Sequence, residues 1–286
     1  MNNAPHPPRK RVDWFSPIAR IAIRSAAGIT SLVIMFIVGY ILIKGIPHLK
    51  PSLFAWKYNS DNVSLTPALI NTILMTILSL IVAVPFGTFT AIYLVEYAKR
   101  GNKLVKIIRM AAETLAGIPS IVYGIFGMML FVVHLKWQYS LLAGGCTLAI
   151  MVLPVIMRTT EEALLAVPDT YREGSFGLGA GKLRTVFKIV LPSAVPGILS
   201  GIILAIGRVV GETAALIFTA GSLAKIPHGA FDSTRTLSVH MYILSGEALH
   251  IDESYATAVV LILLVLFINA VSSWIAKKMT GEKNGK

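Results

Sequence analysis

Arg208 and Glu212 are the charged side chains whose positions most suggest chemistry, because they stand four residues apart in an otherwise apolar stretch, GRVVGETAALIFTAG. An arginine presents a fork of N–H donors that fits an oxyanion, and a nearby carboxylate can orient that fork or weaken its hold on the anion. Charges inside apolar segments usually face a protein interior or a watery cavity and pair with something. The spacing therefore predicts either a structural ion pair that joins two helices or part of an anion pathway.

A helix through this stretch would place its small and polar groups on one narrow stripe. At about 100° per residue, Gly201, Arg208, Glu212 and Thr219 fall within roughly 20° of one line, and bulky apolar residues lie opposite. Such a helix packs its polar stripe against protein and its apolar face against lipid. Tyr123, which follows a proline in another apolar segment, is a second candidate donor to an anion, although a packing kink is the more common case there.

The composition predicts a membrane protein. The 286 residues are 55% apolar and 14% charged, with a mean hydropathy of +0.72. Long apolar blocks without alternation favour helices over a barrel. The net charge of +12 is compatible with nucleic-acid binding, but basic residues kept on the cytoplasmic side of a membrane explain it better, so lipid and not nucleic acid is the expected surrounding. The single cysteine, Cys146, and the spacing of the histidines predict no disulfide and no metal site.

We predict an all-α, polytopic membrane fold with six transmembrane helices, the third bent near Pro119. The apolar stretches that define them lie at 25–43, 62–95, 112–134, 138–157, 193–221 and 254–276. If the chain starts inside, the internal segments hold 19 Lys or Arg, the external loops hold 6, and Arg208 is the remaining one. This asymmetry predicts cytoplasmic N- and C-termini.

These spans divide the chain into four parts. Residues 1–24 form a basic cytoplasmic N-terminus, and residues 25–67 form the first transmembrane helix with an external loop. Residues 68–276 form the main transmembrane domain, which includes a polar cytoplasmic loop at 158–192. Residues 277–286 form a cytoplasmic tail.

The polar loop contains a helix signal and a motif that fails. Pro168 and Asp169 are typical of a helix start and predict a short helix from Thr170 to Phe176. The string GLGAGKL that follows resembles a phosphate-binding loop, but a Walker A motif requires glycine at Phe176 and serine or threonine at Leu183. The chain is therefore not expected to bind or hydrolyse ATP.

The same loop resembles the EAA-x3-G-x9-I-x-LP signature of bacterial ABC importer permeases, with its spacing intact and two small residues in place of the paired alanines. In that family the segment forms the coupling helix that sits in a groove of the ATPase subunit. The resemblance implies a type I ABC importer permease fold. It also implies that a set of loop residues serves ATPase coupling: Glu173, Gly174, Ser175, Gly179, Leu191 and Pro192.

Two further stretches resemble, more narrowly, the PstA-type membrane subunits of bacterial phosphate importers. They are AGIPSIVYGIFG, from Ala116 to Gly127, and GETAALIFTAG, from Gly211 to Gly221. The resemblance covers about 68–276 and implies a non-catalytic permease subunit of an ATP-driven importer of inorganic phosphate in the bacterial inner membrane. The candidate substrate pathway then consists of Arg208, Glu212, Thr219 and Tyr123.

The resemblance also implies the partners of this chain. They are a second, PstC-like permease, an ABC ATPase dimer that uses ATP and Mg, and a periplasmic phosphate-binding protein. No cofactor is expected on the chain itself. ATP binding and hydrolysis in the partner would move the Glu173 segment and reorient the spans, so that phosphate crosses past Arg208 by alternating access.

Two alternatives stay open. The same machine could carry another oxyanion, such as phosphonate, sulfate or molybdate, because the loop signature reports only on the ATPase. An ion-driven secondary transporter could use Arg208 and Glu212 as a relay and would need no ATPase. A membrane enzyme is poorly supported, because the sequence contains no nucleophile with a base and no metal cluster at a useful spacing.

Overall fold

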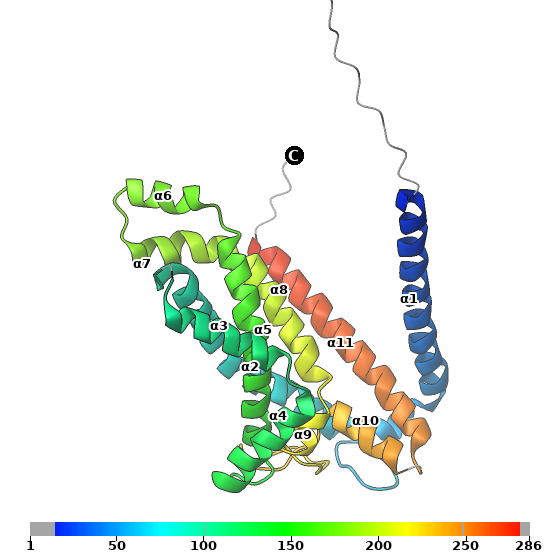
Figure 1. Cartoon of the computed structure of the whole chain (residues 1–286). Helices are drawn as coiled ribbons and strands as arrows, with labels where there is room; N and C mark the ends of the chain where they lie inside the picture. Colours follow the sequence, from blue (N-terminus) through cyan, green and yellow to red (C-terminus); the bar gives the residue numbers. More distant parts are fainter. Residues whose placement is uncertain (1–14, 100, 248, 281–286) are drawn as a thin grey trace, which may run out of the picture.

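The computed structural model describes residues 15–99, 101–247 and 249–280, and the described part consists of helices, turns and loops without strands (Figure 1). Of the expected terminal segments at 1–24 and 277–286, residues 1–14 and 281–286 lie outside the described residues. Within the described part, five helical spans are long and apolar enough to cross a membrane, and a bent pair of helices makes a sixth. The all-α fold with six spans is thereby confirmed. The long helices are α1 (Phe15–Gly45), α2 (Thr66–Ile92), α5 (Leu141–Leu165), α8 (Leu191–Val210) and α11 (Ile251–Thr280).

The bent pair consists of α3 (Lys103–Ala116) and the segment Ser120–His134, which begins with α4 (Ser120–Gly127). The directions of α3 and of this segment differ by 105°. The bend near Pro119 is confirmed, and it is a complete break of the helix. The start of this span at residue 112 is wrong, because α3 begins where the Asn102 side chain accepts a hydrogen bond from the Leu104 N–H at 3.0 Å. A helix N-terminus is stabilised by such a cap, and basic residues in the following turns do not prevent the helix.

The two ends of the bundle are clearly distinguished. The described start of α1, the end of α11 and the short helix α6 (Asp169–Gly177) lie at one end of the molecule (Figure 1). Helix α10 (Leu237–Gly246) lies at the opposite end, with the loops that surround it. We call these the α6 end and the α10 end. Six crossings return the chain to the side on which it began.

The core is built where α2, α5 and α8 pack together. A buried apolar cluster joins Met75 of α2 to Met151 and Ile156 of α5 and to Leu216 further along the chain. Small residues allow this contact, since a Cβ atom added to Gly87 would lie 2.9 Å from the Ile156 side chain. Close backbone approach at small residues is how helices associate in a membrane, where the hydrophobic effect gives no drive between them.

Helix α1 stands apart from this core and, among the described residues, meets the rest of the chain near the α10 end (Figure 1). There Gly45 packs directly against the backbone of Tyr255 in α11, and the Tyr40 ring meets the Tyr255 ring edge-on with centroids 6.0 Å apart. None of the most apolar stretch of α1 is buried within the chain. This helix therefore offers nearly its whole surface to lipid or to another protein.

Several helices run beyond the ends that the charges suggested. Helix α5 reaches Leu165 instead of residue 157, and most of the expected loop at 158–192 is helical. An ion pair between Arg158 and Glu162, with N–O distance 3.2 Å and helical i,i+4 spacing, supports that extension. A charge marks where an apolar span leaves the hydrocarbon, and the helix itself continues into water. The short elements are Ile46–His48, Pro51–Phe54, Tyr93–Tyr97, Met128–His134, α7 (Lys182–Thr185), Val186–Val190 and α9 (Ala214–Ile217).

A buried polar cluster closes the α10 end, outside the spans. His240 of α10 is fully buried, and its ring meets the Tyr58 ring edge-on with centroids 6.0 Å apart. The Arg235 guanidinium lies 4.8 Å from the centroid of the same Tyr58 ring. Burial, followed by the Arg235 charge, lowers the pKa of His240 from 6.5 to about 3.

This shift predicts a loss of stability in acid. Because the folded state resists protonation of His240, the unfolded state binds more protons between about pH 3 and pH 6.5, and the free energy of unfolding falls as pH drops through that window. Two pH units below the ordinary pKa, this amounts to about 2–3 kcal/mol. Thermal denaturation of the purified chain at about pH 7.5 and 4.5 measures it. His240→Gln should lose less stability in acid than the wild type, and exposed His228→Gln should lose as much; equal losses in all three would contradict the assignment.

Candidate functional site

The fifth span ends earlier than its apolar stretch suggested. Helix α8 stops at Val210, residues 211–213 are not helical, and the chain turns into the short helix α9. A single helix over 193–221 is therefore wrong, and the predicted stripe from Gly201 to Thr219 does not form. A signal for the break was present in the sequence, since Gly211 followed by an acidic residue is typical of one helix ending and another beginning.

Glu212 acts as a structural link at this break. Its carboxylate Oε1 accepts a hydrogen bond from the Ala215 N–H at 3.1 Å, and its backbone carbonyl accepts one from the Ser238 hydroxyl at 2.6 Å. The residue is 9% exposed. Glu212 thus satisfies a free N–H at the start of α9 and fastens that segment to α10.

Arg208 is half-buried near the end of α8 and is separate from Glu212. Among the described residues, no ion pair joins Arg208 to Glu212, and no hydrogen bond occupies the Arg208 guanidinium. Of the two alternatives that the sequence left open, the structural ion pair between these residues is therefore wrong, and the anion pathway stays a prediction. The charge of Arg208 is close enough to act on the Tyr123 hydroxyl. A cation at this depth with free donors needs an anion or water as its partner.

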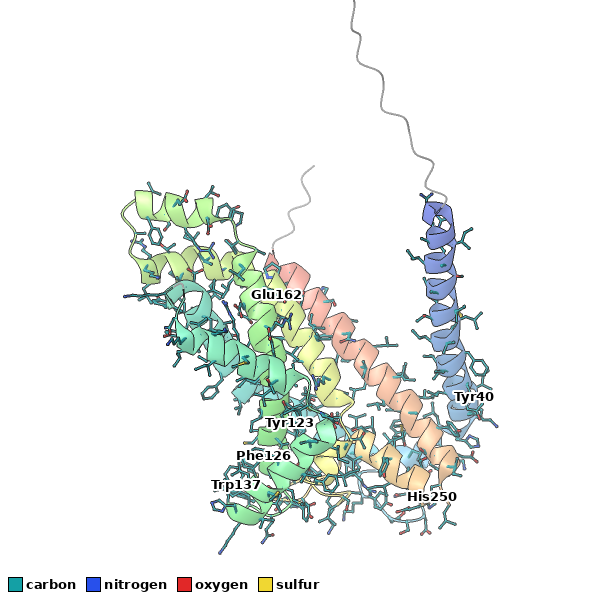
Figure 2. All side chains as sticks on the ribbon, in the orientation of Figure 1. Tyr40, Tyr123, Phe126, Trp137, Glu162 and His250 are labelled. Carbon is teal, nitrogen blue, oxygen red and sulfur yellow. The ribbon has the colours of Figure 1, made fainter. Side chains whose placement is uncertain are left out.

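Tyr123 and Thr219 are both buried and hydrogen-bonded within the chain. Tyr123 is located nearer the α10 end than the α6 end (Figure 2). It is 4% exposed, and its hydroxyl donates to the Leu115 carbonyl at 2.7 Å, which ties α4 to α3 across their bend. Thr219 is fully buried, and its hydroxyl donates to the Ala215 carbonyl at 2.8 Å. Both hydroxyls are thus already committed to backbone carbonyls, and a direct role toward substrate stays a prediction.

The breaks in the third and fifth spans meet in space. Helix α4 packs so tightly on α9 that a Cβ atom on Gly124 would lie 2.8 Å from the Ala215 Cα. Gly117 and Pro119 in the first break and Gly211 in the second are exposed. Non-helical backbone at membrane depth is tolerated only where protein buries it or where it lines a water-filled cavity. This face of the chain must therefore be covered by protein or water in the membrane.

The signature residues gather at the α6 end, and the predicted short helix is confirmed as α6. Glu173 and Gly174 are exposed on it, whereas the Ser175 hydroxyl lies 2.9 Å from the Thr185 hydroxyl of α7. Gly179 follows the helix with a φ of +80°, a conformation that L side chains rarely adopt. Leu191 and Pro192 open α8, so the signature spans α6 and the start of the fifth span.

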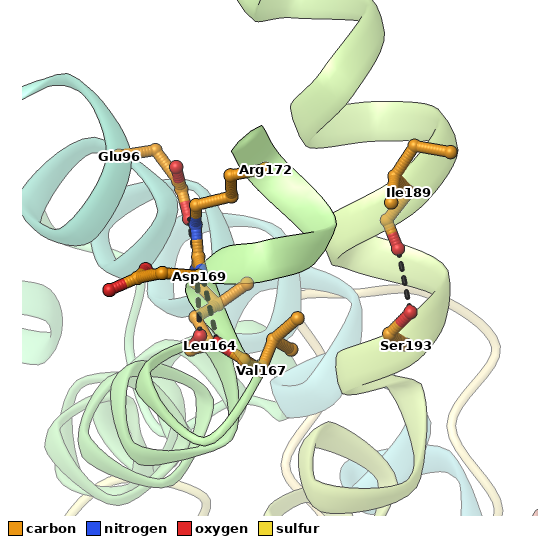
Figure 3. Close-up of polar contacts among 7 residues, drawn as sticks. All are labelled: Glu96, Leu164, Val167, Asp169, Arg172, Ile189 and Ser193. Atoms are coloured by element: carbon orange, nitrogen blue, oxygen red, sulfur yellow. Dashed lines mark hydrogen bonds and ion pairs between the residues drawn. The ribbon is translucent and has the colours of Figure 1, made fainter. Parts of the chain in front are cut away.

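Arg172 and Glu96 are functional candidates that the sequence did not reveal (Figure 3). Arg172 lies in α6, and Glu96 lies in the π-helical turn Tyr93–Tyr97 that ends the second span. The Arg172 Nη2 atom is 2.7 Å from the Glu96 carboxylate Oε1. The guanidinium also donates to the carbonyls of Leu164 at 2.9 Å and Val167 at 2.8 Å. The two charges are 76 residues apart, so each alone resembles an ordinary solvated charge near a span end.

Comparison with known proteins identifies the family of this chain. Residues 83–280 match the family model of the binding-protein-dependent transport system inner membrane component. The chain belongs to this family.

Similar permeases come from several bacteria. A phosphate transport system permease protein PstA of Mycobacterium leprae is 37% identical over 71% of this chain and 67% of its own length. PstA 2 of Mycobacterium bovis is 32% identical over 95% of this chain and 93% of its own length. A probable ABC transporter permease protein, YqgI of Bacillus subtilis, is 32% identical over 90% and 94%, respectively.

Solved ABC transporters share the fold of this permease. The bacterial alginate ABC transporter, in complex with its alginate-bound periplasmic protein, matches with a TM-score of 0.67 at 14% identity over 94% of this chain and 98% of that chain. An inward-facing MetNI methionine transporter matches with a TM-score of 0.58 at 22% identity over 75% and 93%. At these identities the likeness confirms the permease fold and leaves the substrate undecided.

The conformation of Gly179 makes a testable prediction for this permease. Gly179→Ala forces a side chain into the left-handed region, which costs about 1–2 kcal/mol and shifts the end of α6. Gly28→Ala in α1, outside this loop, meets no atom within 4 Å and serves as the control. We expect Gly179→Ala to lower the amount of ATPase that co-purifies with the chain and Gly28→Ala to leave it unchanged. Equal recovery with both variants would contradict the role of this turn.

Proposed function

We propose that this permease is one membrane subunit of an ATP-driven importer of inorganic phosphate. The observation that carries the proposal is Arg208, a half-buried guanidinium with no hydrogen bond or ion pair among the described residues, beside two helix breaks. A guanidinium binds the oxygens of phosphate in a bidentate fashion. Independently of Arg208, the PstA relatives are named as phosphate transport permeases, which favours the same substrate.

A second, PstC-like permease would cover the face that carries the breaks. The exposed backbone at Gly117, Pro119 and Gly211 requires protein or water there, and a path between two permease subunits supplies both. Arg208 would then meet phosphate inside that path. Glu212, Tyr123 and Thr219 would form its wall, since their polar groups hold α4, α9 and α10 in place. The phosphate would leave Arg208 when the spans reorient by alternating access.

The α6 end would be the cytoplasmic end, where an ABC ATPase dimer docks and consumes ATP with Mg. Both chain termini would then be cytoplasmic. Helix α6, the turn after it and α7 expose large apolar side chains, namely Tyr171, Phe176, Leu178 and Leu183. Leu178 is 91% exposed, and an apolar side chain so placed fits a groove of a partner. The α10 end would face the periplasm and the phosphate-binding protein.

Labelled phosphate uptake tests the proposal in bacterial cells that lack their other phosphate importers. We expect uptake only when this chain is expressed together with its ATPase, its second permease and its binding protein. Excess sulfate, molybdate or phosphonate should not compete with phosphate. Uptake without the ATPase would instead support an ion-driven transporter, and competition by another oxyanion would reassign the substrate.

A further inference from the structure

Helix α6 is attached to the rest of the chain by its backbone and by side-chain contacts. The backbone joins it to α5 through residues 166–168 and to α7 through residues 178–181. The Ser175 hydroxyl contacts Thr185 of α7, and Arg172 reaches Glu96, at the end of the second span (Figure 3). Among the described side-chain hydrogen bonds and ion pairs, the contact between Arg172 and Glu96 is the one that joins α6 to the second span.

The contact between Arg172 and Glu96 is a nearly buried ion pair with two hydrogen bonds. The side chains are 15% and 8% exposed, and one carboxylate oxygen accepts from Arg172 Nη2 at 2.7 Å and from Nε at 3.1 Å. The remaining donors reach the carbonyls of Leu164 and Val167, at and just after the end of α5, and the Asp169 carboxylate at 3.2 Å. Charge-assisted bonds at low exposure are short and strong, and the planar fork fixes their direction.

The second span carries this contact across the whole molecule. At the α10 end of α2, the Asn71 side-chain amide donates to the backbone carbonyls of Lys225 at 2.9 Å and Arg235 at 3.2 Å. The Thr72 hydroxyl accepts from the Leu237 N–H at 2.8 Å, where α10 begins. Asn71 is fully buried and Thr72 nearly so. Helix α2 is therefore bonded to α6 at one end and to the segment before α10 at the other.

We infer that Arg172 and Glu96 are positioning residues that transmit movement of α6 to the second span, and through it to the segment at 225–237. The inference rests on the proposed docking of an ATPase on α6. A displaced α6 moves α5 through the backbone, and α5 packs along α2 in the core. The ion pair adds a direct bond between α6 and the end of the second span. It therefore fixes how closely that end, and with it the α10 end, follows α6 when the ATPase moves.

The test compares two variants with a matched control in the complete transporter reconstituted in liposomes. Glu96→Ala removes the link to α2 and leaves the bonds from Arg172 to the α5 carbonyls in place. Arg172→Gln removes both. Glu162→Ala is the control, because it deletes a carboxylate that also pairs with an arginine, at 3.2 Å, but within one helix and at the surface. The readout is the amount of oxyanion imported per ATP hydrolysed.

We expect Glu96→Ala and Arg172→Gln to lower this ratio at least about fivefold while hydrolysis continues, and Glu162→Ala to leave it unchanged. A wild-type ratio in Glu96→Ala, or transport and hydrolysis that fall in equal proportion, would overturn the inference. If Arg172→Gln fails to assemble, Glu96→Ala decides alone. The ratio is measured with whichever oxyanion the wild type imports. A wrong substrate assignment therefore changes the oxyanion used, whereas a wrong role for Arg172 and Glu96 leaves the ratio at its wild-type value in the variants.

Discussion

Arg208→Gln should reduce phosphate uptake at least about 30-fold, because it removes the charge and the fork of donors from the pathway. The complex should still assemble, since the Arg208 guanidinium makes no hydrogen bond or ion pair with the described part of its own chain. Uptake of labelled phosphate in importer-deficient cells measures the loss, and co-purification of the ATPase measures assembly.

Two further variants separate charge from geometry at this position. Arg208→Lys keeps the positive charge but replaces the planar fork with a point charge, so we expect an intermediate loss of about tenfold. Arg24→Gln removes an exposed arginine from α1, near the α6 end, and should leave uptake unchanged. Wild-type uptake by Arg208→Gln would remove this residue from the pathway.

The sequence predicted the spans well because their determinant is local. Hydrocarbon excludes charge, so the run of apolar residues and the bias of Lys and Arg report the number of crossings without any knowledge of packing. Helix α6 was found for a related reason, since Pro168 and Asp169 are start signals that act within one turn. The ends of α3 and α5 were misjudged because charge marks the membrane boundary and not the end of a helix.

The site was predicted only in part, because its arrangement depends on contacts between distant segments. The pattern that placed Arg208 and Glu212 on one line assumed an unbroken helix, but Glu212 gains an N–H partner at the start of α9 and Ser238 fixes its carbonyl. Ser238 is 26 residues away. Arg172 and Glu96 were missed for the same reason. Their partnership exists only after the second and fourth spans have packed.

Helices α4 and α9 pack so closely that one added methyl group is expected to have a large effect on stability and on uptake. In Gly124→Ala, the new Cβ would lie 2.8 Å from the Ala215 Cα and 3.2 Å from the Ala214 carbonyl oxygen. These are backbone atoms, so no side chain can rotate away, and the two helices must separate. Overpacking of this kind costs about 1–3 kcal/mol, and here it would also displace the break beside Arg208.

Gly28→Ala in α1 is the matched control, because a Cβ there meets no atom within 4 Å. With no clash, replacing a helical glycine by alanine should stabilise the helix by about 0.5–1 kcal/mol. The two variants carry the same chemical change but should affect the melting temperature of the purified chain differently. Gly124→Ala should lower it, and Gly28→Ala should raise it or leave it unchanged. Phosphate uptake should fall only in the first. If Gly124→Ala melts no lower than the wild type, the tight crossing of α4 and α9 does not hold the two breaks together, and the wall beside Arg208 needs another support.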